Sequence, residues 1–272
     1  MSILEAIVLG IVQGLTEFLP ISSTAHLRVV PAFAGWEDPG AAFTAITQLG
    51  TALAVVIYFR DDLLRIVRTW LRSLREPELR RELDARLGWY LIVATIPIAI
   101  FGFVFQDQIE SGARDLYLIG AALIALGLIL LLAEKVGSRT RGLERVVRRD
   151  AVVVGFAQAL ALVPGVSRSG ATISAGLFLG LRRETAARFS FLLSVPAVVL
   201  SGLFELTAFA DESDGSGFGD LVVATLFAFL AGYAAIAFLL RFLVTHTTMV
   251  FVAYRVVLGT VVIALVAAGA IS

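Results

Sequence analysis

The chain has 272 residues, of which 58% are hydrophobic, and its mean hydropathy is +0.90. Soluble domains are about 45–50% apolar, and several apolar runs approach the ~20 residues that a helix needs to cross a bilayer. This composition favours a polytopic α-helical membrane protein over a soluble one. The formal net charge of zero gives no indication of a nucleic-acid partner, and the absence of cysteine excludes disulfides, thiolate metal ligands and cysteine nucleophiles.

The first 35 residues are apolar at both edges and broken in the middle by polar and helix-breaking residues. The broken stretch reads Gln13-Gly-Leu-Thr-Glu17-Phe-Leu-Pro20-Ile-Ser22-Ser-Thr-Ala-His26. Irregular backbone at membrane depth persists only where protein or a wet cavity covers it. The sequence therefore predicts a re-entrant helix–loop–helix hairpin over 1–35, not a full span.

Six later segments are apolar and long enough to be transmembrane helices, at roughly 41–59, 88–105, 116–133, 186–209, 220–240 and 249–270. Segment 151–181 is broken in its middle like 1–35 and predicts a second re-entrant hairpin. Three spans follow each hairpin, so an odd number of crossings separates the hairpins and the two halves have opposite orientation. The predicted fold class is an all-α polytopic membrane protein with six transmembrane helices plus two re-entrant helix hairpins in an inverted repeat.

The charges of the loops predict how this single membrane domain is oriented. Its expected parts are a first repeat over 1–133, a cytoplasmic linker over 134–150 and a second repeat over 151–272. The linker, 60–86 and 181–188 are rich in arginine, whereas 210–220 has no base. The protein is expected in the cell membrane. The positive-inside rule then places the basic segments on the cytoplasmic side of that membrane. We interpret 60–86 as a solvated loop, with an interfacial amphipathic helix as the alternative.

Gln13 and Glu17 lie four residues apart, which places them on one face of a helix. Carboxylate and amide oxygens are the ligands that hard cations prefer, so this pair predicts a metal site for Mg²⁺ or Ca²⁺. The alternative is a structural Glu17 that pairs with a buried base. Burying a carboxylate for packing alone is costly, which favours the functional interpretation.

Pro20 ends the first helix of the hairpin, and Ser22, Ser23 and Thr24 follow it. Hydroxyls at this position cap the next helix, and the free N–H groups of a helix start bind anions such as phosphate. His26 lies three residues after Ser23, so both can face one side of that helix. Ser23 could then be a nucleophile with His26 as its base, or His26 could act as acid or base toward the phosphate. The alternatives are a plain serine cap and a structural histidine.

The second motif is the more specific of the two and reads Pro164-Gly-Val-Ser167-Arg168-Ser169-Gly170-Ala-Thr172. Small residues let backbone amides approach a ligand closely, so we predict phosphate contacts at Ser167, Ser169, Gly170 and Thr172. Arg168 is always charged and can bind phosphate oxygens bidentately, with an internal pair to Glu17 as the alternative. Arg255, inside the last span, is either a second phosphate clamp or a side chain that snorkels to the interface.

With these residues the chain resembles the bacitracin-resistance type undecaprenyl-diphosphate phosphatase family. The two motifs carry the resemblance, which extends over essentially the whole chain in length, span count and motif spacing. It implies removal of the terminal phosphate of a polyprenyl diphosphate at the outer membrane face, with a divalent cation. It also implies a catalytic core of Glu17, Ser23 and Arg168. Ala25 stands where the family usually has glycine, and Gln13 stands where it has Glu or Gln.

The predicted function is an integral membrane phosphatase that converts undecaprenyl (polyprenyl) diphosphate into the monophosphate carrier lipid. The second hypothesis is a polyprenyl-phosphate flippase or transporter, because inverted repeats with broken helices are transporter anatomy. The type 2 phosphatidic-acid phosphatases need a histidine after their Ser-Arg motif, and this chain has none between 27 and 245. The expected partners are the lipid substrate and the bilayer, and the sequence also allows a homodimer.

Overall fold

A computed structural model describes residues 1–105, 115–212 and 218–271, with the side chains of 41, 42, 199–212 and 218 left out of the description. Over these residues the protein is all-helical, with one isolated bridge between Arg141 and Leu181. The α-helices are α1 (Ile3–Phe18), α2 (Ser23–Ala34), α3 (Gly40–Tyr58), α4 (Arg60–Arg75), α5 (Leu83–Val104), α7 (Leu116–Val136), α8 (Arg148–Ala159), α9 (Arg168–Phe178), α10 (Arg183–Glu212), α11 (Phe218–Thr245) and α12 (Met249–Ala267). The 3₁₀ helices are η1 (Pro77–Arg81), η2 (Leu143–Arg145) and η3 (Leu160–Leu162).

Within the described residues, four helices are long and apolar enough to cross a membrane: Leu83–Val104, Leu116–Val136, Gly219–Thr245 and Met249–Ala267. A fifth candidate is the pair formed by Phe43–Tyr58 and Arg60–Arg75, which is bent by 74°. The prediction of a polytopic helical membrane protein is therefore confirmed. Each of the six predicted spans corresponds to a helix, but the number six stays a prediction.

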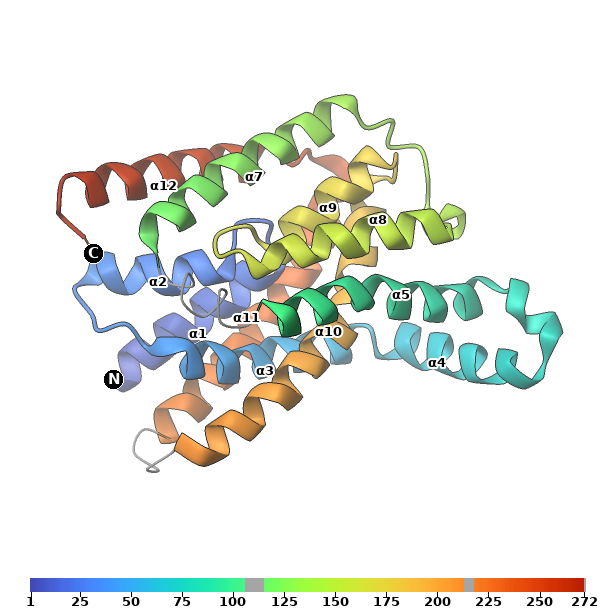
Figure 1. Ribbon diagram of the computed structural model, residues 1–272, viewed down its shortest axis with the longest axis horizontal. Helices are drawn as coiled ribbons and strands as arrows, with labels where there is room; N and C mark the ends of the chain where they lie inside the picture. Colours follow the sequence, from blue (N-terminus) through green and yellow to red (C-terminus); the bar gives the residue numbers. More distant parts are fainter. Residues whose placement is uncertain (106–114, 213–217, 272) are drawn as a thin grey trace.

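Segment 60–86 is helical over most of its length, so its interpretation as a loop is wrong. Helix α4 carries Leu64, Val67 and Leu71 on one exposed stripe and buries Ile66 on another face. It runs beside α5, and the two form a long hairpin that projects from the bundle (Figure 1). The amphipathic helix that the sequence offered as the alternative describes this segment better.

The two broken segments pack against their neighbours in matching ways. Helix α1 packs along α11, and α8 packs along α5 (Figure 1). A side chain on Gly10 would overlap the carbonyl oxygen of Ala224, and one on Gly155 would overlap that of Ala94. Small residues of this kind let helix backbones touch inside a membrane protein. Gly10 and Gly155 each stand three residues before a glutamine, Gln13 or Gln158, and they have the same packing role in the two halves.

The turns after α1 and η3 are also alike. Ser22 has φ 76° and ψ 104°, and Ser167 has φ 70° and ψ 116°. Each serine Oγ accepts a hydrogen bond from the amide three residues on, at 3.4 Å from Ala25 and 3.1 Å from Gly170. Positive φ is uncommon outside glycine and concentrates at functional sites, where the surroundings enforce it. In the described part of the chain, Arg139 is the other non-glycine residue with positive φ.

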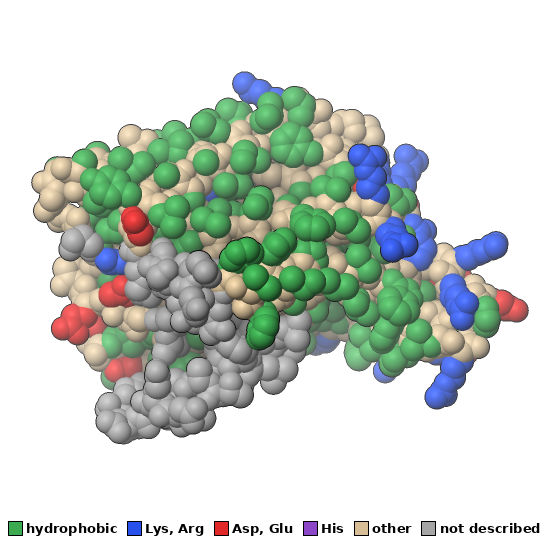
Figure 2. Space-filling model, viewed as in Figure 1, with side chains coloured by type: hydrophobic (Ala, Val, Ile, Leu, Met, Phe, Trp, Pro, Cys, Tyr) green, Lys and Arg blue, Asp and Glu red, His purple; other side chains and the backbone are tan. Residues whose placement is uncertain are grey.

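Charged side chains gather at the ends of the bundle and hydrophobic ones cover the face between (Figure 2). At the basic end Glu134 is a carboxylate with 4% exposure. It accepts hydrogen bonds at 2.8 Å from each of Arg183 Nε, Arg139 Nη1 and Thr248 Oγ1. Charge-assisted bonds are roughly twice as strong as neutral ones. Glu134 therefore ties α7 to the first turn of α10 and the start of α12.

Candidate active site

A cavity of about 490 Å³ lies between the two turns and the helices around them. Its polar lining is made of residues from both motifs and from two neighbouring helices: Gln13, Glu17, Ser22, Ser23, Thr24, Thr44, Gln48, Thr95, Ser167 and Arg168. Its apolar lining is Ile98, Ala99, Gly102, Phe103, Ala161, Leu162 and Ala197. The cavity therefore joins a hydrogen-bonding end to a hydrocarbon-like end.

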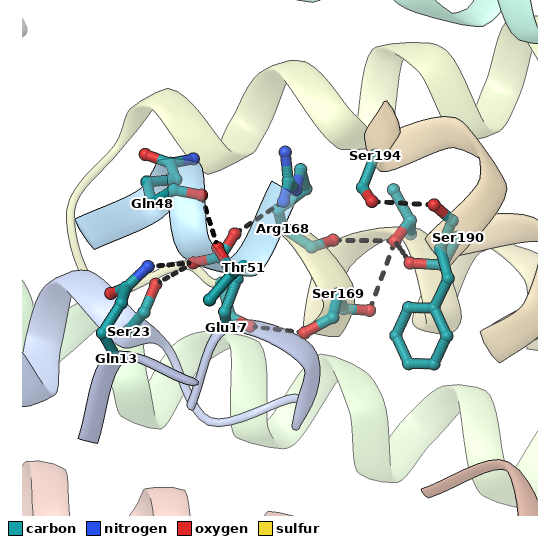
Figure 3. Close-up of polar contacts among 12 residues, drawn as sticks. Gln13, Glu17, Ser23, Gln48, Thr51, Arg168, Ser169, Ser190 and Ser194 are labelled. Atoms are coloured by element: carbon teal, nitrogen blue, oxygen red, sulfur yellow. Dashed lines mark hydrogen bonds and ion pairs between the residues drawn. The ribbon is translucent and has the colours of Figure 1, made fainter. Parts of the chain in front are cut away.

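Glu17 is at the centre of the polar end and joins the two motifs (Figure 3). Arg168 Nη2 donates to its Oε1 at 2.6 Å, and Ser23 Oγ donates to its Oε2 at 2.7 Å. Gln13 Nε2 donates to the same Oε2 at 3.1 Å. With 8% exposure, the Glu17 carboxylate is buried, and such a charge is stable only when it is paired and hydrogen-bonded. The four residues that the sequence selects from two distant segments thus form one cluster.

Local structure explains why Ser23 and Arg168 meet here. Each is the first residue of its helix, α2 or α9, directly after a serine cap. The first amides of a helix have no partner within it, and the helix dipole adds partial positive charge at that end. Both helix starts contribute residues to the cavity lining. The polar end therefore combines two helix N-termini with one guanidinium, an arrangement suited to a phosphate-bearing anion.

Three of the predicted phosphate contacts lie behind the lining, where they hold the turns together. Ser169 Oγ donates to the carbonyl of Leu19 at 3.0 Å, which links the second turn to the first. Thr172 Oγ1 donates to the carbonyl of Arg168 at 2.7 Å and lies 2.6 Å from Ser190 Oγ. The amide of Gly170 is used by the Ser167 cap. Ser169, Gly170 and Thr172 thus shape the site without facing the cavity.

His26 also lies behind the cavity wall. Its Nδ1 is 2.7 Å from the carbonyl oxygen of Ser22, and its Nε2 is 2.7 Å from the hydroxyl of Tyr254. The carbonyl can only accept, so Nδ1 carries the proton in this bond. The sequence predicts a Ser23–His26 pair, but the Ser23 hydroxyl binds Glu17 instead. The imidazole fixes the backbone of the first turn.

Arg255 has 0% exposure and contacts both turns. Its guanidinium donates to five backbone carbonyls: Pro20 at 3.1 Å, Gly165 at 2.9 Å, Val166 at 3.1 Å, Leu123 at 3.1 Å and Ala122 at 3.4 Å. The side chain therefore neither faces the cavity nor reaches the interface, the two positions that the sequence suggests. It clamps the first turn, the second turn and α7 together.

The oxygen atoms at the polar end suit a divalent cation that shares its ligands with a phosphate. Gln13 Oε1 is buried and has no hydrogen-bond partner among the described residues, and it belongs to the carboxamide whose Nε2 donates to Glu17. No three His, Cys, Asp or Glu side chains cluster as metal ligands among the residues described. Mg²⁺ commonly takes one or two carboxylates and completes its shell with water and substrate phosphate. These donors fit that mode and do not form a complete protein cage.

Sequence reasoning missed Thr44 and Gln48 on α3 and Thr95 on α5, which all line the cavity. They stand inside segments that read as plain spans. A signal was present, because a polar residue within a span usually faces the protein interior or a wet cavity. Gln48 is the strongest case, since it brings a carboxamide to the same end of the cavity as Glu17 (Figure 3).

These features define a class: a polytopic membrane protein with a buried carboxylate–serine–arginine site that faces an amphipathic cavity. The chain belongs to the family described as Bacitracin resistance protein BacA, whose model matches residues 6–261. The undecaprenyl-diphosphatase of Mycolicibacterium smegmatis is 56% identical over 275 residues, covering 100% of this chain and 99% of the relative. The undecaprenyl-diphosphatase of a Nocardioides species is 52% identical over 269 residues, covering 99% and 98%. The predicted family is confirmed.

Proposed function

We propose that this protein is an integral membrane phosphatase that hydrolyses the terminal phosphate of undecaprenyl (polyprenyl) diphosphate. The observation that carries the proposal is the hydrogen-bonded Ser23–Glu17–Arg168 cluster at two helix N-termini in an amphipathic cavity. Family membership and relatives that are 51–56% identical and named undecaprenyl-diphosphatase support it. The resulting monophosphate is the carrier-lipid form of the substrate.

Binding begins with an exchange of partners at Arg168. Its guanidinium forms an ion pair with the Glu17 carboxylate at 2.6 Å. A diphosphate offers oxygen acceptors in the fork geometry that arginine matches best, while the first amides of α2 and α9 bind further oxygens. Arg168 then turns from Glu17 toward the phosphate. This exchange frees the carboxylate to accept a proton.

The chemical step uses the Ser23 hydroxyl, which already donates to Glu17 at 2.7 Å. Ser23 Oγ forms a bond to the terminal phosphorus as its proton passes to Glu17, and the bond from that phosphorus to the bridging oxygen breaks. Polyprenyl monophosphate leaves. Water then attacks the phosphorus of the phosphoserine, and the bond from that phosphorus to Ser23 Oγ breaks as the proton held on Glu17 returns to Ser23 Oγ. Inorganic phosphate departs with the protons of the water, and the Ser23 hydroxyl and the Glu17 carboxylate are restored. The alternative is a water that Ser23 positions for direct attack, and trapping of phosphoserine separates the two routes.

Other residues at the site act by position and charge. A divalent cation bound by Glu17 and Gln13 Oε1, together with phosphate oxygens, would neutralise charge that develops on the phosphate. We assign His26 a positioning role, because it binds the carbonyl of Ser22 next to the nucleophile. Preorganised donors of this kind are the usual source of rate enhancement in phosphoryl transfer.

We further propose six spans, two re-entrant hairpins and an active site toward the outer face. The first helices of the hairpins support re-entry, because 16 and 12 residues rise only about 24 and 18 Å against a core of about 30 Å. The cavity is lined by the early part of α3 and the late part of α5. Those parts are the ends of α3 and α5 that are remote from the basic segment 60–86, and the positive-inside rule assigns that segment to the cytoplasm.

Phosphate release from detergent-purified protein tests this function. Wild-type protein with undecaprenyl diphosphate should release inorganic phosphate, and chelation of divalent cations should slow the release. Arg168→Ala should abolish it, whereas Arg75→Ala, at an exposed arginine of α4, should not. A lipid transporter without phosphatase activity would release none, so an inactive but folded wild type would favour the flippase hypothesis. The homodimer stays a prediction that light scattering in detergent would measure.

A further inference from the structure

The polar lining of the cavity extends beyond the two motifs onto α3 and α5. Thr44 and Gln48 come from α3, and Thr95 comes from α5. The two threonines already use their hydroxyl protons within their own helices. Thr44 Oγ1 donates to the carbonyl of Gly40 at 3.1 Å, and Thr95 Oγ1 donates to the carbonyl of Leu91 at 2.7 Å. Neither hydroxyl can donate to a ligand without a change of partner.

Gln48 differs from these threonines, because its half-buried carboxamide lines the cavity and has no hydrogen-bond partner among the residues that the structure describes. The contact between Gln48 and Thr51 in Figure 3 uses the backbone carbonyl of Gln48, which accepts from Thr51 Oγ1 at 2.8 Å. A primary carboxamide carries two donor protons and an acceptor oxygen. Polar side chains inside membrane segments usually mark a substrate path or a wet cavity. The carboxamide of Gln48 therefore indicates a polar part of the ligand on the α3 side of the cavity.

The phosphate that reacts already has its donors from the two motifs, in Arg168, Ser23 and the first amides of α2 and α9. A diphosphate has a second phosphate, which carries the lipid tail. This inner phosphate must lie between the reacting phosphorus and the apolar lining from α5 and η3. Figure 3 shows Gln48 at the same end of the cavity as Glu17, on a helix that carries no residue of either motif. Gln48 is thus placed to contact the part of the diphosphate that the motifs leave without donors.

We propose that Gln48 binds the inner phosphate of the substrate, the one that stays on the lipid, by donating a hydrogen bond from its Nε2. This inference rests on the proposed function. When the bond from the terminal phosphorus to the bridging oxygen breaks, its electron pair stays on that oxygen, so the inner phosphate gains negative charge. A donor aimed at this phosphate binds the transition state more tightly than the substrate. Gln48 thereby favours a lipid diphosphate over a lipid monophosphate, which has no second phosphate.

A neutral donor suits a group that must leave with the product. Glu17 and Arg168 are the charged residues of the described lining, and both are engaged at the reacting phosphate. An arginine at position 48 would add a charge-assisted, bidentate contact that retains the lipid monophosphate after the reaction. A carboxamide orients the inner phosphate without that charge, so the product can dissociate.

The first test replaces the carboxamide with side chains of similar length. Gln48→Met removes both donor protons and should lower kcat/KM for undecaprenyl diphosphate by about 10–100-fold, the size of a hydrogen bond to a charged group, with Tm unchanged. Gln48→Glu should lose more activity, because it places a carboxylate beside the inner phosphate. Leu53→Met is the control on the same helix, at a 52% exposed residue outside the lining, and should keep wild-type turnover. Wild-type turnover in Gln48→Glu would assign Gln48 to the cation and overturn the proposal.

The second test separates contact with the inner phosphate from a general effect on the site. Methylenediphosphonate, which has two linked phosphate-like groups, and inorganic phosphate, which has one, are compared as inhibitors at a fixed concentration of free Mg²⁺. In wild-type protein Ki should be about tenfold or more lower for methylenediphosphonate, and Gln48→Met should remove most of this difference without changing Ki for phosphate. Equal Ki values in the wild type, or a difference that persists in Gln48→Met, would overturn the role of Gln48 alone. A wild type that releases no phosphate from undecaprenyl diphosphate would overturn the proposed function instead.

Discussion

Replacing Arg255 with methionine should loosen both turns of the active site. Methionine keeps much of the length and the apolar stem of arginine but removes every donor. Three of the five acceptors, the carbonyls of Pro20, Gly165 and Val166, lie in turns and have Arg255 as the partner observed here. The other two, on α7, belong to a helix whose amides also bind its carbonyls. The substitution therefore leaves three buried carbonyls to be satisfied in another way.

The magnitude follows from these three groups. An unsatisfied buried carbonyl costs about 1–3 kcal/mol, so three cost about 3–9 kcal/mol. Removal of a buried guanidinium recovers several kcal/mol of its desolvation penalty, which leaves a net loss of roughly 2–4 kcal/mol. For a chain of this size each kcal/mol lowers Tm by about 2–4 °C, so we expect Tm to fall by roughly 5–15 °C. Turnover should fall by ~10²-fold, because a misplacement near 1 Å can have an effect of that size.

Tryptophan fluorescence during heating in detergent measures the first effect, and phosphate release at a temperature where the variant is folded measures the second. Arg255→Lys should give an intermediate result, since a single ammonium with three protons cannot serve both turns and α7. Arg75→Met, on exposed α4, is the matched control for loss of an arginine. An Arg255→Met variant with wild-type Tm and wild-type turnover would refute the clamp.

Three further substitutions address the reacting groups and the packing behind them. Ser23→Ala should lower kcat by ~10³-fold or more without changing Tm, and substantial turnover in this variant would rule out Ser23 as the nucleophile. Glu17→Gln should lower kcat by ~10²–10⁴-fold, the usual range for a lost general base, whereas an unchanged kcat would assign proton transfer to another group. Gly10→Val should reduce the yield of folded protein, because its side chain would overlap the carbonyl of Ala224; a normal yield and Tm would show that α1 and α11 can separate.

The ion pair between Glu17 and Arg168 was predictable from the sequence. The physical reason is that both charged side chains lie within apolar segments. A carboxylate and a guanidinium inside apolar segments need partners. Each of the two predicted hairpins carries one of these charges, so the two charges can pair. The family resemblance, carried by the same two motifs, pointed to the same residues. The helices also followed from composition, because long apolar runs have few alternatives in a membrane.

His26, Arg255 and Gln48 were not predictable in the same way. His26 and Arg255 bind carbonyl oxygens of the backbone, and every residue has a carbonyl, so no sequence pattern marks the acceptor. Gln48 faces the cavity because of the way α3 is rotated in the bundle, which depends on packing with α10 and α11. Helix α4 was predicted only as the alternative to a loop, because its many charges obscured an apolar stripe with helical spacing.

The Glu134 cluster has a consequence for the path of the lipid. Parting α7 from α10 and α12 at that end would separate a buried carboxylate from its arginine partners, which costs about 3–5 kcal/mol. We therefore expect the helices to move apart only at the end of the bundle that is remote from Glu134. A long-tailed product would then return to the same leaflet that delivered the substrate.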